Sequence, residues 1–289
     1  PIKEAAVEAI RKGFNRYTAT QGIAPLNEAI LDSVEQRCNL RPESSLVTIG
    51  VAGGLTLGLL SLLDAGDRAL IPDPYFICYR NLAEMVSGPP AYYDLYPDFR
   101  ITEERLEAGM TEGVRVLVVN SPANPTGRVH DEAELDAVAA FARRHDLVVI
   151  SDEIYDVFSF DGPSPSLFGR YDKVVLLGGF SKTYGMPGWR LGYAVGPSEL
   201  IDTMRTLQQF SYVCAPTPLQ YGVLEAAKVD MSPYIEAYRN KRDLVVAKLA
   251  EHYELVRPEG AFYAFPRVPG GLSAMDFAER ALERNLLLV

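Results

Sequence analysis

The sequence predicts an α/β fold in which a mostly parallel, doubly wound sheet forms a large domain and a smaller α+β domain follows it. Two observations lead to this prediction. Short apolar, β-branched runs alternate with amphipathic helical stretches along residues 1–231. The runs 116–119, 148–150 and 174–177 are apolar throughout, as strands buried on both faces require. We therefore expect helices to cover both faces of the sheet.

Each element is predicted from its own residues. Five apolar runs bounded by turn-forming residues predict strands, at 68–71, 114–120, 147–151, 173–177 and 191–195. Apolar residues at helical spacing predict helices over 131–144 and 198–209. Another helix is expected to open at the glycine-rich stretch 50–54.

The pattern changes after Ser232, where the smaller domain is predicted to begin. Residues 233–253 predict a long helix, a strand pair is expected near Leu255 and over 262–265, and a last helix over 274–284. The large domain is thus placed at 1–231 and part of the small domain at 232–289. The chain opens at Pro1 and stops after an apolar run, 286–289, that is typical of an unfinished strand. We expect both ends to be trimmed.

Composition restricts the function. A formal charge of −10 argues against nucleic acid or an anionic membrane as a partner, because a phosphate backbone requires a basic face. The apolar run 55–63 is far shorter than the roughly 20 residues that a bilayer requires. Three widely spaced cysteines fit reduced thiols in the cytoplasm, and three scattered histidines predict no metal site. A cytoplasmic enzyme acting on small molecules is expected.

Four stretches lie where chemistry is expected in such a fold, since ligands bind at the carboxyl ends of parallel strands. They are Gly-Val-Ala-Gly-Gly at 50–54, Ser-Pro-Ala-Asn-Pro-Thr-Gly at 121–127, Asp-Glu-Ile-Tyr at 152–155 and Gly-Gly-Phe-Ser-Lys-Thr at 178–183. Taken singly, each has a structural explanation: a tight connection, a turn, a helix cap or a surface lysine.

Taken together, the four stretches supply what a pyridoxal 5′-phosphate (PLP) site requires. Lys182 provides the amine that would hold the cofactor as an internal aldimine. Asp152 provides a carboxylate that keeps the pyridine nitrogen protonated and the ring electron-withdrawing. Tyr155 and Asn124 provide donors for the phenolic oxygen.

The cofactor phosphate is expected at the start of the helix that opens near residue 50. The free amides of Val51, Ala52 and Gly53 and the helix dipole favour an anion there. Arg190, eight residues after Lys182, would add a charge-assisted pair.

With these motifs the sequence resembles the class I and II aminotransferases, the fold-type-I PLP enzymes, over essentially the whole chain. The family's Asn-Pro-Thr-Gly turn stands at 124–127 and its aspartate and tyrosine at Asp152 and Tyr155. Its lysine and phosphate arginine match Lys182 and Arg190, and Ser181 precedes that lysine. The resemblance implies a PLP-transferase-like fold and the transfer of an amino group between an L-amino acid and a 2-oxo acid. Lys182 would be both anchor and acid/base.

The resemblance also assigns two aromatic residues. Tyr17 matches the tyrosine that reaches the phosphate of the neighbouring subunit, which implies a homodimer with shared sites. Phe76, in Asp-Pro-Tyr-Phe, falls at the position that stacks on the cofactor. The competing interpretations are a packed tyrosine at a helix end and a core phenylalanine.

The sequence departs from the family at several positions. Phe180 and Gly179 stand where many members carry a serine that helps to hold the phosphate, so one donor is absent. The arginine for the substrate α-carboxylate lies in a segment that this chain does not contain after Val289. Ala52 replaces a lysine of one subgroup, and 209–216 offers no clear basic residue for a second carboxylate. These departures favour neutral or aromatic substrates.

Three other functions remain open at this point. A β-lyase, decarboxylase or cyclopropane-forming synthase uses the same cofactor residues, and an aminotransferase-like ligand-sensing domain keeps the fold without the reaction. A nucleotide-binding enzyme using 50–54 is disfavoured, because the glycine spacing fits neither the dinucleotide fingerprint nor a P-loop.

Overall fold

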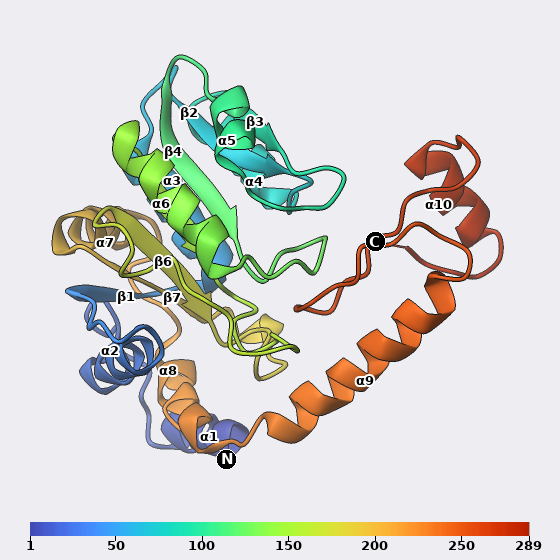
Figure 1. The fold of residues 1–289 in the computed structure, drawn as a ribbon. Helices are drawn as coiled ribbons and strands as arrows, with labels where there is room; N and C mark the ends of the chain where they lie inside the picture. Colours follow the sequence, from blue (N-terminus) through green and yellow to red (C-terminus); the bar gives the residue numbers. More distant parts are fainter. Residues whose placement is uncertain (289) are drawn as a thin grey trace.

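A seven-stranded sheet forms the centre of the molecule in the computed structural model, which describes residues 1–288 (Figure 1). Its strand order is β1-β7-β6-β5-β4-β2-β3. Neighbours from β3 to β6 pair in parallel, whereas β7 runs antiparallel to both β6 and β1. The strands are β1 (Ser44–Thr48), β2 (Arg68–Asp73), β3 (Ala91–Asp94), β4 (Val114–Asn120), β5 (Val148–Asp152), β6 (Val174–Gly179) and β7 (Gly192–Gly196). The predicted mostly parallel sheet is confirmed.

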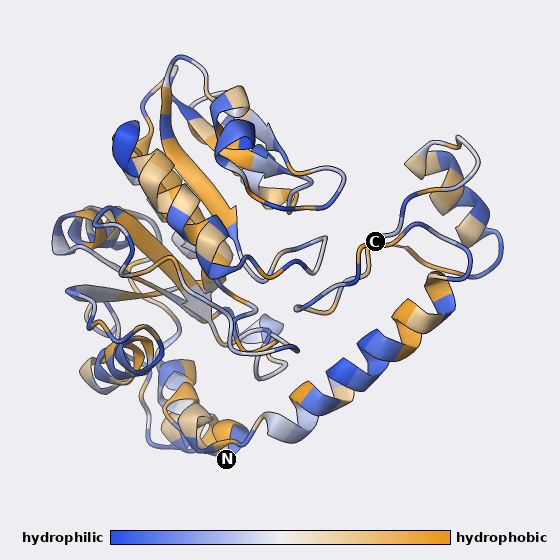
Figure 2. Cartoon of the chain, viewed as in Figure 1, coloured by the Kyte–Doolittle hydropathy of each residue, from blue (hydrophilic) through white to orange (hydrophobic). Residues whose placement is uncertain are grey.

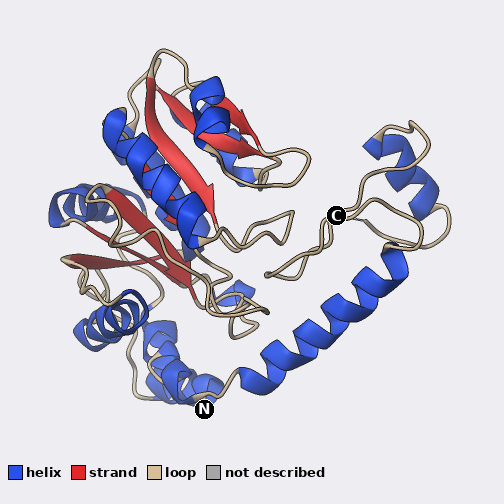
Figure 3. Ribbon diagram, in the orientation of Figure 1, coloured by secondary structure: helices blue, strands red, loops and turns tan. Residues whose placement is uncertain are grey.

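Helices pack on both faces of this sheet (Figure 3). They are α1 (Ile2–Arg11), α2 (Ala24–Cys38), α3 (Gly50–Leu62), α4 (Cys78–Val86), α5 (Glu103–Gly109), α6 (Glu132–Arg144), α7 (Ser198–Ser211), α8 (Thr217–Val223), α9 (Ser232–Leu249) and α10 (Ala274–Leu282). Two short 3-10 turns, η1 (Pro187–Trp189) and η2 (Ala226–Lys228), complete the set in the described chain. The predicted helices at 131–144 and 198–209 are confirmed as α6 and α7.

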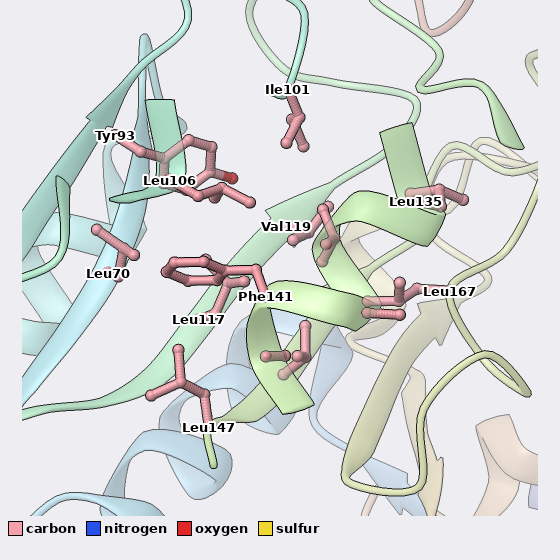
Figure 4. Close-up of a cluster of buried hydrophobic side chains, with 14 of the residues drawn as sticks. Leu70, Tyr93, Ile101, Leu106, Leu117, Val119, Leu135, Phe141, Leu147 and Leu167 are labelled. Carbon is pink, nitrogen blue, oxygen red and sulfur yellow. The ribbon is translucent and has the colours of Figure 1, made fainter. Parts of the chain in front are cut away.

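Alternate residues of the central strands pack into two separate hydrophobic cores, one on each face of the sheet. On one face Leu117 and Val119 of β4 pack with Phe141 of α6 and Leu106 of α5 (Figure 4). On the other face the intervening valines of β4 pack with α3, α4 and α7. Because both faces are buried, residues 116–119 of β4 are apolar throughout, and most of β4 is hydrophobic in Figure 2.

The C-terminal part begins with α9, which leads away from the sheet toward α10 (Figure 1). The strand pair expected near Leu255 and over 262–265 is not formed, and these residues are loops. Just before 262–265, the backbone of residues 259–261 binds loops beside the sheet, with Ala261 N–H donating to the Phe158 carbonyl. The helix ends at Leu249 rather than at residue 253. Residues 286–288 are not a strand, and Val289 lies outside the described residues.

The division into domains at 1–231 and 232–289 stays a prediction, although α9 begins at Ser232. In residues 1–288, no helix combines the length and the apolar character needed to span a membrane.

Candidate active site

The carboxyl ends of three parallel strands and the start of α3 meet around one cavity of about 190 Å³. Nine of the eleven predicted site residues line it: Val51, Ala52, Phe76, Asn124, Asp152, Tyr155, Ser181, Lys182 and Arg190. The other two, Gly53 and Tyr17, do not.

The pairing of the strands explains this convergence. Asn120 at the end of β4 lies opposite Asp152 at the end of β5, and Asp152 lies opposite Leu177 of β6. The loops that leave these strands therefore start at one level. The Asn120 side chain fixes the first loop, because its amide donates to the Asp152 carbonyl (2.9 Å) and its oxygen accepts from Asn124 N–H (2.7 Å).

Asp152 is a buried carboxylate with two donors. Its side chain accepts from the Tyr79 hydroxyl at 2.7 Å and from Ile154 N–H at 3.2 Å. Burial raises the pKa of Asp152 to about 6, although both hydrogen bonds and the Lys182 charge act in the opposite direction. Burying this carboxylate without a counter-charge is costly. A cationic group of a ligand in this cavity would supply that counter-charge.

Lys182 enters the cavity from the loop after β6. Its Nζ lies 5.9 Å from the ring centroid of Tyr155 and 5.9 Å from that of Phe262. Tyr155 is buried, and its hydroxyl lies 2.6 Å from the hydroxyl of Tyr263. A primary amine held among aromatic rings is well placed to react with an aldehyde.

The part of the cavity beside the start of α3 suits an anion. The α3 N-terminus presents free backbone amides there, and Arg190 lies over it with Nη2 3.4 Å from the Ile49 carbonyl. Gly50 makes this approach possible, since a Cβ there would lie only 2.6 Å from Arg190 Nη2. Its φ of +67° also favours glycine.

A buried ionic cluster holds the Asp152 loop from the other side. Glu153 is 2% exposed and accepts from the Ser151 and Ser166 hydroxyls, both at 2.8 Å. Arg37 of α2 places its Nη1 2.7 Å from Glu153 and 3.6 Å from Asp156. The segment that carries Asp152 and Tyr155 is thereby fixed to α2.

Three further predicted positions can be located. Phe76 borders the cavity just before α4, with its ring edge-on to Tyr79 at 5.7 Å. Ser181 is 8% exposed and also borders the cavity. Phe180 packs against the rings of Tyr184 and Tyr193 and offers no donor.

Gly53, in the first turn of α3, and Tyr17 do not line the cavity. Gly53 is buried inside α3, and a Cβ there would meet the Ile49 side chain at 3.3 Å. Tyr17 is 80% exposed on the loop between α1 and α2. That loop is held in place: Thr217 donates to the Arg16 carbonyl at 2.8 Å and Gln208 to the Thr20 carbonyl at 2.7 Å.

Among the cavity-lining residues that sequence reasoning missed, two carry hydroxyl groups, Tyr79 and Tyr263. Tyr79 is fully buried and lies one helical turn after Phe76, which is the signal that was available. Tyr263 is brought in from more than a hundred residues beyond Tyr155, and no local pattern marks it.

The donor set fits PLP. The described residues offer an amine (Lys182), a buried carboxylate (Asp152), a hydroxyl and an amide for the ring oxygen (Tyr155 and Asn124), and an anion cradle with Arg190. Among residues 1–288, no cluster of three or more potential metal ligands is found.

The chain is similar to known aminotransferases along its whole length. Residues 1–289 match the profile of the family described as aminotransferase class I and II. A probable aspartate aminotransferase of Methanocaldococcus jannaschii is 34% identical, with 100% of this chain and 80% of the relative covered. An aromatic-amino-acid aminotransferase of Thermococcus litoralis is 33% identical, covering 100% and 78%.

Solved structures agree with these matches. The aromatic aminotransferase of Pyrococcus horikoshii superimposes with a TM-score of 0.95 at 34% identity, over 100% of this chain and 82% of that one. An aspartate aminotransferase of Thermus thermophilus, solved with maleate, gives a TM-score of 0.93 at 32% identity, over 100% and 79%.

Proposed function

The chain belongs to the class I and II aminotransferases and is a PLP-dependent enzyme, and from this premise we propose that Lys182 is the residue that binds PLP and moves the proton. The enzyme transfers an amino group between an amino acid and a 2-oxo acid. The observation that carries the proposal is the position of Lys182, in one cavity with the buried carboxylate of Asp152.

Each lining group has a separate task in this proposal. Bound PLP supplies an aldehyde for the amine and a ring that withdraws electrons from the substrate Cα. Asp152 keeps the ring nitrogen protonated, and Tyr155 with Asn124 binds the ring oxygen. The Lys182 amine, once released, removes the proton from the substrate Cα. Ser181 precedes Lys182 in the sequence, lines the same cavity and is proposed to bind the cofactor.

The phosphate is assigned to the start of α3. Amides of Val51, Ala52 and Gly53 and the guanidinium of Arg190 would bind it. Phe76 is assigned to the face of the ring. The close approach of Arg190 to Gly50 supports this arrangement.

We propose neutral or aromatic amino acids as the preferred donors. Phe76, Tyr155 and Tyr263 present aromatic surface to the cavity, and both of its cations, Lys182 and Arg190, already have tasks. A second substrate carboxylate would be desolvated without a counter-charge from the described residues. The relatives named for aspartate and for aromatic amino acids match almost equally well, at 34% and 33% identity.

A panel of amino donors tests the function and the preference together. With 2-oxoglutarate as acceptor, we expect aromatic donors to react at least about tenfold faster than L-aspartate. Release of ammonia or carbon dioxide without a new amino acid would contradict transamination. A preference for aspartate would overturn only the substrate assignment.

We propose that the enzyme is a homodimer in which Tyr17 reaches the phosphate of the neighbouring subunit. A rigidly held loop that exposes 80% of a tyrosine side chain supports this assignment. We also propose a cytoplasmic location, since Cys38, Cys78 and Cys214 are all free thiols.

Mixed dimers test the Tyr17 assignment. Tyr17→Ala is expected to weaken PLP binding at least about tenfold, the effect of losing a hydrogen bond to a charged group. Mixing Tyr17→Ala with Lys182→Ala chains should restore tight PLP binding and activity, because each mixed dimer has one intact site. If Tyr17 served its own subunit, the mixture would contain no intact site, and PLP would bind as weakly as it does to Tyr17→Ala alone.

A further inference from the structure

The Tyr155 hydroxyl has a neighbouring hydroxyl that the proposed function does not use. It lies 2.6 Å from the hydroxyl of Tyr263, which comes from the loop between α9 and α10. We propose that Tyr263 is a positioning residue: it donates its proton to the Tyr155 oxygen and so directs the Tyr155 proton toward the cofactor's ring oxygen. This inference rests on the proposed function of Tyr155.

Backbone hydrogen bonds fix the position of Tyr263. Gly260 N–H donates to the Gly127 carbonyl and Ala261 N–H to the Phe158 carbonyl, both at 2.8 Å. A Cβ on Gly260 would lie 2.5 Å from the Phe158 oxygen, so this approach requires glycine. The segment 258–263 thereby joins the loop of Asn124 to the loop of Tyr155.

A charged pair adds to this attachment. Arg128, which follows the Asn124 turn, donates through Nη1 to both carboxylate oxygens of Glu259, at 2.9 and 2.8 Å. Its Nη2 donates to Glu134 at 2.6 Å. Tyr263 is therefore presented to the cavity by a segment anchored through both its backbone and its side chains.

The number of protons decides the direction of the hydrogen bond. A phenol has one proton to donate, and its oxygen can also accept. Burial raises the pKa of both tyrosines, so both hydroxyls stay protonated at neutral pH. If Tyr155 donates to the ring oxygen, the proton between the two tyrosines comes from Tyr263. A hydroxyl that accepts a hydrogen bond is also a stronger donor.

The readout is the pH at which the visible absorption band of the PLP-loaded protein changes. Donation by Tyr155 stabilises negative charge on the ring oxygen, and weaker donation makes that oxygen more basic. Tyr263→Phe is therefore expected to raise the pH midpoint by about half a unit. In a Tyr155→Phe background the same substitution should leave the midpoint unchanged, because the hydroxyl through which Tyr263 acts is gone.

Tyr238→Phe is the matched control. It removes a hydroxyl from the same aromatic cluster, where the Tyr238 ring packs against Phe158 and Phe262, and it should leave the midpoint unchanged. A Tyr263→Phe midpoint equal to that of the unaltered protein, or an equal shift in the Tyr155→Phe background, would overturn the inference alone. Absence of a Lys182-dependent band in the unaltered protein would overturn the proposed function as well.

Discussion

Replacing Lys182 with alanine is expected to lower the transamination rate by about 10⁴-fold, at the upper end of what a general acid–base group contributes. The reason is that one amine serves twice, as the attachment point of PLP and as the group that moves the substrate proton. No other lysine lines the cavity in the described part of the chain.

Initial rates with the best amino donor measure this effect. Lys182→Arg keeps the positive charge between the rings of Tyr155 and Phe262 but cannot bond to an aldehyde, so it should be as inactive as alanine. Lys173→Ala, on a half-exposed lysine paired with Asp146, should retain full activity. A Lys182→Ala rate within tenfold of the unaltered enzyme would show that another amine performs the reaction.

Replacing Asp152 with asparagine is expected to lower the rate by about 10²- to 10³-fold, as removal of a preorganised electrostatic group typically does. The asparagine has nearly the same shape, so the loss isolates the negative charge that keeps the ring nitrogen protonated. Asp152→Glu retains that charge and serves as the comparison. A fully active asparagine variant would remove Asp152 from the mechanism.

Asp152→Asn should also stabilise the PLP-free protein. A loss of activity together with a gain of stability shows that the loss is not caused by misfolding. The folded-state pKa of Asp152, about 6, lies above its ordinary value of 3.8. The protonated Asp152 side chain therefore makes its full contribution to the free energy of unfolding below pH 3.8. This contribution is lost as pH rises through 6. At pH 8 the ionised, buried carboxylate costs about 3 kcal/mol, which asparagine avoids.

Urea unfolding of the PLP-free protein at pH 8 and pH 5 checks this sign. The amide can accept from Ile154 N–H and donate to the Tyr79 hydroxyl oxygen, so the contacts of Asp152 can be kept. Asp152→Asn should unfold at higher urea at pH 8, with a smaller gain at pH 5. Equal or lower stability at pH 8 would mean that the carboxylate is not strained by burial.

The strands buried on both faces were predictable because burial makes their sequences continuously apolar. In β4 every residue from Val116 to Val119 is buried, so the run is apolar without alternation. The two strands that were not predicted, β1 and β3, lie at the edges of the sheet. The four residues of β3 alternate between buried and exposed, a pattern too short to distinguish from a loop.

The site was predictable where its residues follow strands, and not where tertiary contacts complete it. Asp152 ends β5, Asn124 and Lys182 come shortly after β4 and β6, and parallel strand ends meet at one edge. Tyr263 follows residues 259–261, whose backbone binds the loops of Asn124 and Tyr155, and the strand pair expected over 262–265 is not formed. These contacts join residues that lie far apart in the sequence, so no local pattern marks Tyr263.

Chemical mapping of the cofactor attachment tests whether Lys182 binds PLP. The protein is incubated with PLP, reduced with borohydride, digested and analysed by mass spectrometry, with Lys182→Ala treated in parallel. We expect one phosphopyridoxyl group at Lys182 in near-stoichiometric amount, and none at any other lysine in the variant. Stoichiometric labelling of a different lysine, with Lys182 unmodified, would contradict it.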